Sequence, residues 1–115
     1  MSRVLRTLRQ KRLREIGEAG QARLFAGTAV VRGQGTRAEM ALRYLVGAGI
    51  GRVRASGAWA ALVQRLDAEI VFEPEDGDVD APPAPEWIED AQVAEAWRGV
   101  AEALRQIRAI ALEQE

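Results

Sequence analysis

The chain contains no cysteine and no histidine among its 115 residues. Disulfides, thiolate nucleophiles, imidazole bases and the usual zinc sites are therefore excluded from it. A carboxylate site for a hard cation is the only kind of metal site that the composition permits. We expect no metal and no resident cofactor.

Long apolar runs are also missing. No stretch is long enough to span a bilayer, and no apolar signal-peptide core follows the basic N-terminus. The length suits one domain with a modest hydrophobic core. We expect a cytoplasmic protein that forms a single domain over residues 1–115 and does not bind membranes.

Lysine occurs once, as Lys11, and the charges are unevenly distributed. Residues 1–54 carry twelve basic and three acidic side chains, whereas residues 55–115 carry four basic and fourteen acidic ones. Either the basic half binds an anion, or the two halves neutralise each other within one molecule or across an oligomer. Because no aromatic residue precedes Phe25 and the acidic half would repel a polyanion, we do not expect nucleic-acid binding.

The first 27 residues read as an N-terminal helical extension. Apolar residues recur every three to five positions over 3–16, with arginines between them, which favours a helix. Gly17 and Gly20 interrupt this pattern, so a short second helix is predicted over 21–25, ended by Gly27.

Residues 28–72 alternate between strand and helix patterns. The clearest helix has apolar residues at 38, 41, 42, 45 and 46, the spacing of one helix face. Alternation of this kind favours parallel strands joined by right-handed crossovers. We predict a three-layer α/β/α half-Rossmann fold with three strands in the order 3-2-1. Its predicted elements are strand 29–31, the helix from Ala38 to about Gly47, strand 50–55, helix 59–66 and strand 68–72.

An acidic, proline-rich loop is predicted over 73–85, followed by a long C-terminal helix over 86–113. Its apolar residues follow the 4-3 spacing of a coiled-coil seam. This seam either covers one face of the sheet within the monomer or is shared with a second copy of the chain. The candidate interface residues are Val93, Trp97, Val100, Leu104 and Ile107.

Three motifs together resemble the ThiF/MoeB/HesA family, whose members adenylate ubiquitin-like and sulfur-carrier proteins. They cover nearly half of the chain, at the spacing of the family, and a looser similarity resumes over 62–72. The motifs are Arg6-Thr7-Leu8-Arg9-Gln10, Ile16-Gly17-Glu18-Ala19-Gly20-Gln21-Ala22-Arg23-Leu24, and Val30-Val31-Arg32-Gly33-Gln34-Gly35 followed by Tyr44-Leu45-Val46-Gly47-Ala48-Gly49-Ile50-Gly51.

The resemblance implies a glycine turn that binds the phosphates of ATP or another nucleotide at a helix N-terminus. The candidate nucleotide-binding residues are Gly33, Gly35, Ala38, Arg32 and Arg37. Thr36 and Glu39 have the spacing of a capping box. If that box forms, it occupies the amides that would otherwise meet a phosphate, whereas the two arginines would attract an anion.

Most of the catalytic groups of the family are missing. The stretch 55–58 lacks the ribose-binding acid, and the catalytic lysine, metal-binding aspartate, catalytic cysteine and zinc cysteines have no counterparts. We therefore expect no enzyme activity. Arg9 matches an arginine that, in the family, reaches into the partner subunit's nucleotide site, so it is a candidate trans-acting arginine or else a surface residue.

The sequence thus predicts a non-catalytic ThiF-like protein that acts through protein–protein contacts. The expected partners are a second copy in a homodimer, an adenylyltransferase, or a ubiquitin-like or sulfur-carrier protein. A sheet with two open edges and a small core would gain from dimerisation. The alternative is a small module that binds ATP, AMP or NAD without turnover.

Overall fold

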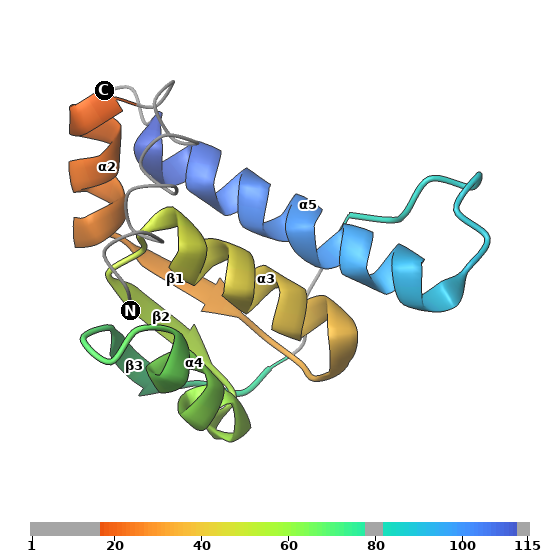
Figure 1. Ribbon diagram of the computed structural model, residues 1–115, viewed down its shortest axis with the longest axis horizontal. Coiled ribbons are helices and arrows are strands. Elements are labelled where there is room, and N and C mark those ends of the chain that lie inside the picture. Colours follow the sequence, from red (N-terminus) through yellow and green to blue (C-terminus); the bar gives the residue numbers. More distant parts are fainter. Residues whose placement is uncertain (1–16, 78–81, 113–115) are drawn as a thin grey trace.

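Three short parallel strands and the helices between them form the centre of the computed structural model, which describes residues 17–77 and 82–112 (Figure 1). The elements are α2 (Gly17–Ala26), β1 (Thr28–Val31), α3 (Gly35–Ala48), β2 (Arg52–Ala55), η1 (Gly57–Trp59), α4 (Ala60–Leu66), β3 (Val71–Pro74) and α5 (Ala91–Ala111). The predicted helix over 3–16 and the candidate Arg9 lie outside the described residues.

The strand order is β1-β2-β3, and both neighbouring pairs are parallel. In the register, Ala29 pairs with Val53 and Val31 pairs with Ala55. The predicted α/β class, with a short three-stranded parallel sheet in the order 3-2-1, is confirmed.

The two faces of the sheet differ sharply. Ala29, Val31, Val53 and Ala55 are fully buried on the face that α3 and α4 cover, and Figure 1 shows both helices on that side. Side chains on the opposite face are exposed or half-buried, and they include Arg54. The described helices therefore cover one face of the sheet, and the second helical layer of the predicted three-layer α/β/α fold is not found over 17–77 and 82–112. The reason is that right-handed crossovers between strands in sequential order place α3 and α4 on the same side.

The helix α3 lies at the centre of the core. All five positions of its predicted apolar stripe are buried, at 0 to 2% exposure. The helix ends where Gly49 adopts φ +103° and donates its backbone N–H to the carbonyls of Leu45 and Val46. This left-handed C-terminal cap explains why glycine ends the helix here.

The helix α5 lies against α3 and along the outer edge of β1. A Cβ added at Gly99 would lie 2.2 Å from the carbonyl oxygen of Arg37, so the two helices meet closely there. The Gln106 side chain accepts from the N–H of Val30 at 3.0 Å and donates to its carbonyl at 2.8 Å. The prediction of two open sheet edges is therefore wrong, because Gln106 takes the place of a neighbouring strand at β1.

Several element boundaries differ from the predictions, including those of α2, β3 and α5. The helix α2 begins at Gly17 and contains Gly20, because its packing on α5 outweighs the roughly 1 kcal/mol that glycine costs in a helix. The strand β3 runs from Val71 to Pro74, since a turn held by Asp67 occupies its predicted start. Pro74 fits because its ring nitrogen faces the free edge of this outer strand.

The C-terminal helix begins at Ala91, five residues later than predicted. The Asp90 carboxylate accepts from the backbone N–H of Val93 at 3.0 Å and caps the helix there. Among the described helices, none is long and apolar enough to cross a membrane.

Candidate functional site

The glycine turn after β1 places two glycines in the left-handed backbone region, which favours glycine over other residues. Gly33 and Gly35 have φ values of +86° and +88°, and α3 begins immediately behind them. The turn lies at the carboxyl ends of the parallel strands, where ligands of open α/β sheets bind. Ala38 is fully buried in the first turn of α3, where its small side chain allows close packing.

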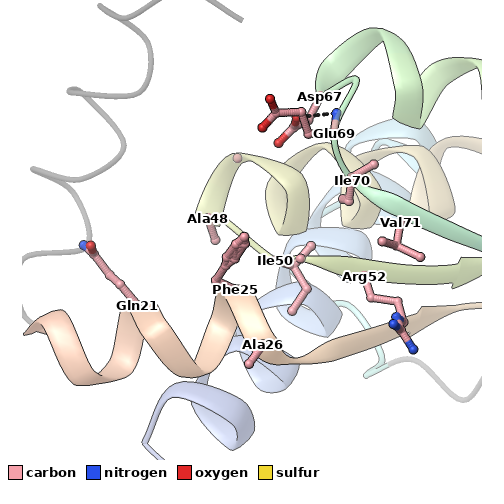
Figure 2. Close-up of a pocket in the computed structure, with 13 residues that line it drawn as sticks. Gln21, Phe25, Ala26, Ala48, Ile50, Arg52, Asp67, Glu69, Ile70 and Val71 are labelled. Atoms are coloured by element: carbon pink, nitrogen blue, oxygen red, sulfur yellow. Dashed lines mark hydrogen bonds between the residues drawn. The ribbon is translucent and has the colours of Figure 1, made fainter.

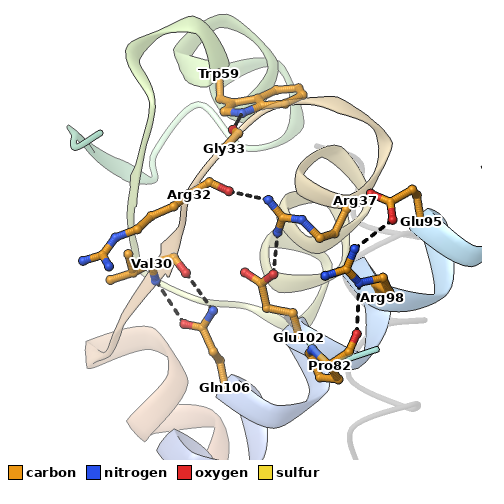
Figure 3. A network of polar contacts seen from close by, with 10 residues as sticks. All are labelled: Val30, Arg32, Gly33, Arg37, Trp59, Pro82, Glu95, Arg98, Glu102 and Gln106. Atoms are coloured by element: carbon orange, nitrogen blue, oxygen red, sulfur yellow. Dashed lines mark hydrogen bonds and ion pairs between the residues drawn. The ribbon is translucent and has the colours of Figure 1, made fainter. Parts of the chain in front are cut away.

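Arg37 points under this turn rather than out to solvent (Figure 3). Its guanidinium pairs with Glu102 of α5 at 2.6 Å and donates to the carbonyl of Arg32 at 2.6 Å. A Cβ added at Gly33 would lie 2.7 Å from Nη2 of Arg37. The charge of Arg37 is thus neutralised inside the protein and faces no ligand in this arrangement.

Glu102 is an acid with no exposed surface in the middle of α5. One carboxylate oxygen accepts from Arg37, and Oε2 has no hydrogen-bond partner in the part of the chain that the structure describes. Burial raises the pKa of Glu102 above its ordinary value of 4.5, although the nearby positive charge of Arg37 opposes the shift. Because both side chains are enclosed, we interpret the pair as a structural link between α5 and the glycine turn.

The space between the ends of β1 and β2 is bridged by the protein's own side chains. Trp59 donates its indole N–H to the carbonyl of Gly33 at 3.0 Å, and Gln34 donates to the hydroxyl of Ser56 at 3.0 Å. In a Rossmann fold a dinucleotide crosses this region. A nucleotide would have to displace these contacts.

The predicted capping box does not form. Gln34 is the N-cap residue of α3 and makes no side-chain cap. Thr36 instead donates its hydroxyl to Gln92 of α5 at 3.0 Å, while Glu39 pairs with Arg43 one turn along α3 at 2.8 Å. The prediction was wrong because partners on α5 and on the next turn compete for both side chains. Among the described residues, no side chain consequently accepts a hydrogen bond from the first amides of α3.

The basic and acidic halves of the chain neutralise each other at several places. Arg32 pairs with Glu75 at 3.0 Å, and Arg54 pairs with Glu73 at 3.0 Å on the exposed face of the sheet. The hydrogen bond and negative charge of Glu73 raise the pKa of Arg54. These contacts favour the interpretation that the charge asymmetry is balanced within one molecule. Within 17–77 and 82–112, no group of three or more acidic side chains is placed to hold a metal ion.

The predicted seam of α5 is divided between the core and the surface. Ile107 is buried at 2% exposure, near the end of α5 where α2 packs and Arg23 donates to the carbonyl of Ala111 at 2.8 Å. Val93 is 54% exposed, Trp97 37% and Leu104 36%. Only one end of the seam therefore serves the monomer's core. We call Val93, Trp97, Val100 and Leu104 the α5 stripe; Val100 is half-buried.

A pocket of about 520 Å³ lies at the opposite, amino ends of the strands. Figure 2 shows Phe25, Ile50 and Ile70 directed into it, with the carboxylates of Asp67 and Glu69 at its rim. The predicted site residues do not line it. Parallel α/β sheets bind their ligands at the other end, so the pocket and the glycine turn are separate features.

Sequence reasoning missed three residues that shape these sites: Trp59, Glu102 and Gln106. The two α5 residues had a usable signal, since both lie on the helix face that also carries Gly99 and Ala103, opposite the seam. A buried acid or amide on a helix requires a polar partner. The position of Trp59 over the glycine turn had no signal in the sequence.

In comparisons with known proteins, no family model and no curated protein matches the chain. The resemblance to the ThiF/MoeB/HesA family therefore rests on the three motifs and stays a prediction.

Proposed function

We propose that this protein is a non-catalytic, ThiF-like unit that acts by binding another protein through the α5 stripe. The observation that carries the proposal is the exposure of Trp97, Val93 and Leu104 on one face of a helix whose other face is already packed. Large aromatic and aliphatic side chains gathered in this way mark protein–protein contacts. The partner is a second copy of the chain or, as the motifs suggest, an adenylyltransferase or its carrier protein.

The condition of the glycine turn supports a role without catalysis. Both arginines predicted to bind phosphate are paired with acids, Arg37 with Glu102 and Arg32 with Glu75. An adenylation site needs unpaired cations to stabilise the charge of the transferring group. The turn instead joins β1, Trp59 and α5 into one unit that holds the stripe in place.

Sedimentation of wild type, Trp97→Glu and Tyr44→Glu tests the proposal. Tyr44 is the matched control, because it is an aromatic residue of similar exposure, 42%, on a different helix. We expect wild type and Tyr44→Glu to associate with similar affinity. Trp97→Glu should weaken association at least about 30-fold, the effect of a 2 kcal/mol hot spot. Equal weakening by both variants would contradict a specific role for the stripe.

One observation favours nucleotide binding as a second candidate: no side chain in 17–77 or 82–112 accepts from the first amides of α3, which lie behind two glycines with positive φ. Such amides bind phosphate. A thermal-shift titration with ATP, AMP and NAD, with and without magnesium, tests this candidate. If a nucleotide binds, it should raise the melting temperature of wild type, and Gly35→Glu should abolish this increase. Gly49→Glu is the control and should keep the increase, since Gly49 also has positive φ but lies at the far end of α3.

A further inference from the structure

The α5 stripe is flanked by small residues. Ala94, Ala96 and Ala101 lie beside it, and none of the three is fully buried. The four residues of the stripe and Ala96 carry no charge, and Arg98 lies between Ala94 and Ala101 at the edge of this face. Alanine lets a second helix approach closely, whereas lysine or glutamate at these positions would hold it away. The face is therefore shaped to receive another helix.

The two ends of α5 carry opposite charges. Glu86, Glu89 and Asp90 lie at its amino end, and Arg105 and Arg108 lie near its carboxyl end. Glu89 and Arg108 are exposed and make no ion pair with a residue that the structure describes. A parallel copy of α5 would bring like charges together, whereas an antiparallel copy would bring the acidic end of each helix against the basic end of the other.

We infer that α5 pairs with α5 of a second copy of the chain, in antiparallel orientation about a two-fold axis near Trp97 and Val100. In this arrangement Trp97 packs against Val100 of the second copy, and Val93 packs against Leu104. Glu89 lies opposite Arg108 at each end. The antiparallel dipoles of the two helices add to the attraction. The contact is self-complementary, as a two-fold interface requires.

This inference rests on the proposed function, because it names the partner of the α5 stripe and the direction in which that partner lies. The chain has no cysteine, so single cysteines report the orientation without interference. Val93→Cys and Leu104→Cys are prepared as separate full-length proteins and oxidised alone and as an equal mixture. Ala109→Cys, at an exposed α5 position away from the stripe, gives the rate of crosslinking by random collision.

Antiparallel pairing predicts that the mixture forms the Val93→Cys to Leu104→Cys disulfide at least about tenfold faster than Ala109→Cys crosslinks. A disulfide needs Cα atoms within about 7 Å, so each single variant alone should crosslink no faster than that control. Rapid crosslinking of each variant with itself, in a protein that sediments as a dimer, would overturn the antiparallel arrangement and leave the proposed function standing. A protein that stays monomeric up to about 500 µM would overturn the pairing with a second copy, and the proposed function would then require a different protein as the partner of the α5 stripe.

Charge-reversal variants test the antiparallel orientation without crosslinking. Arg108→Glu places an acid opposite Glu89 and should weaken the dimer about fivefold. Glu89→Arg combined with Arg108→Glu restores the opposite pairing, so the double variant should dimerise like wild type. Failure of the double variant to recover, with its folded state intact, would overturn the pairing of these two ends.

Discussion

Arg37 and Glu102 form a buried ion pair of 2.6 Å, and this contact joins the turn after β1 to the middle of α5. The same guanidinium lies beneath Gly33 and donates to the carbonyl of Arg32. The Arg37 guanidinium, which the motifs predict to bind phosphate, therefore binds groups of the protein itself. The position of the α5 stripe depends on this link.

Removing one member of the pair should be costly. Glu102→Ala leaves a buried guanidinium without its counter-charge, so we expect the free energy of unfolding to fall by about 3 kcal/mol. Glu95→Ala is the control, because Glu95 forms a partly exposed pair with Arg98 on the same helix and should cost about 0.5 kcal/mol. Urea unfolding followed by circular dichroism measures both. Equal losses of unfolding free energy in the two variants would show that the buried pair stabilises the fold no more than the partly exposed pair does.

Stability should depend on the protonation of Glu102. Its pKa is raised by burial, so the folded state holds this proton more tightly than the unfolded state does. The resulting stabilisation is complete below the ordinary value of 4.5 and is lost as the pH rises through the raised pKa. We therefore compare the free energies of unfolding of wild type and Glu102→Gln. The difference, wild type minus variant, should fall as the pH rises from 4.5 through the raised pKa of Glu102. A difference that rises or stays flat would contradict the direction of the shift.

Two neighbouring glycines should respond differently to alanine. Both have positive φ, which costs a side chain about 1 kcal/mol, and a Cβ at Gly35 meets no atom within 4 Å. A Cβ at Gly33 would displace the guanidinium of Arg37 as well. We expect Gly33→Ala to lower the unfolding free energy by about 3 kcal/mol and Gly35→Ala by about 1 kcal/mol. Thermal melts should show a larger loss of stability for Gly33→Ala than for Gly35→Ala. A larger loss for Gly35→Ala would refute this expectation.

Gln106 should protect the edge of the sheet. Gln106→Leu leaves the N–H and carbonyl of Val30 without partners, which should cost about 2 kcal/mol and expose β1 to pairing with other chains. Gln64→Leu, at an exposed position on α4, makes the same chemical change away from the sheet edge. Light scattering on warming should detect aggregation of the first variant before the second. Matching behaviour would mean that the edge is closed in some other way.

The fold was largely predictable because its signals are local. The apolar stripe of α3 and the short β-prone runs specify the alternation of helix and strand, and the tendency of consecutive strands to lie side by side then gives the strand order. The capping-box error came from a contact between distant residues, because Thr36 bonds Gln92, 56 residues away, rather than capping its own helix. The later start of β3 has a local cause, since the Asp67 carboxylate accepts from the backbone N–H of Glu69 and forms a turn there.

The position of the candidate site in the chain was predictable, but the contacts that its side chains make were not. The positions of Gly33 and Gly35 follow from the motif, and their backbone conformation agrees with it. The direction of the Arg37 side chain depends on Glu102, 65 residues away. The seam of α5 was visible as a pattern, but only the packing of α2 decides which part of it stays exposed.

We infer that the α5 stripe binds a second copy of the chain. Sedimentation equilibrium of the full-length wild type from about 5 to about 500 µM, which covers micromolar and weaker dissociation constants, measures this association. We predict a mass that rises from the 12.6 kDa of one chain towards twice that value, and a Trp97→Glu variant that stays at the lower mass. A wild type that remains at the mass of one chain throughout would contradict the claim.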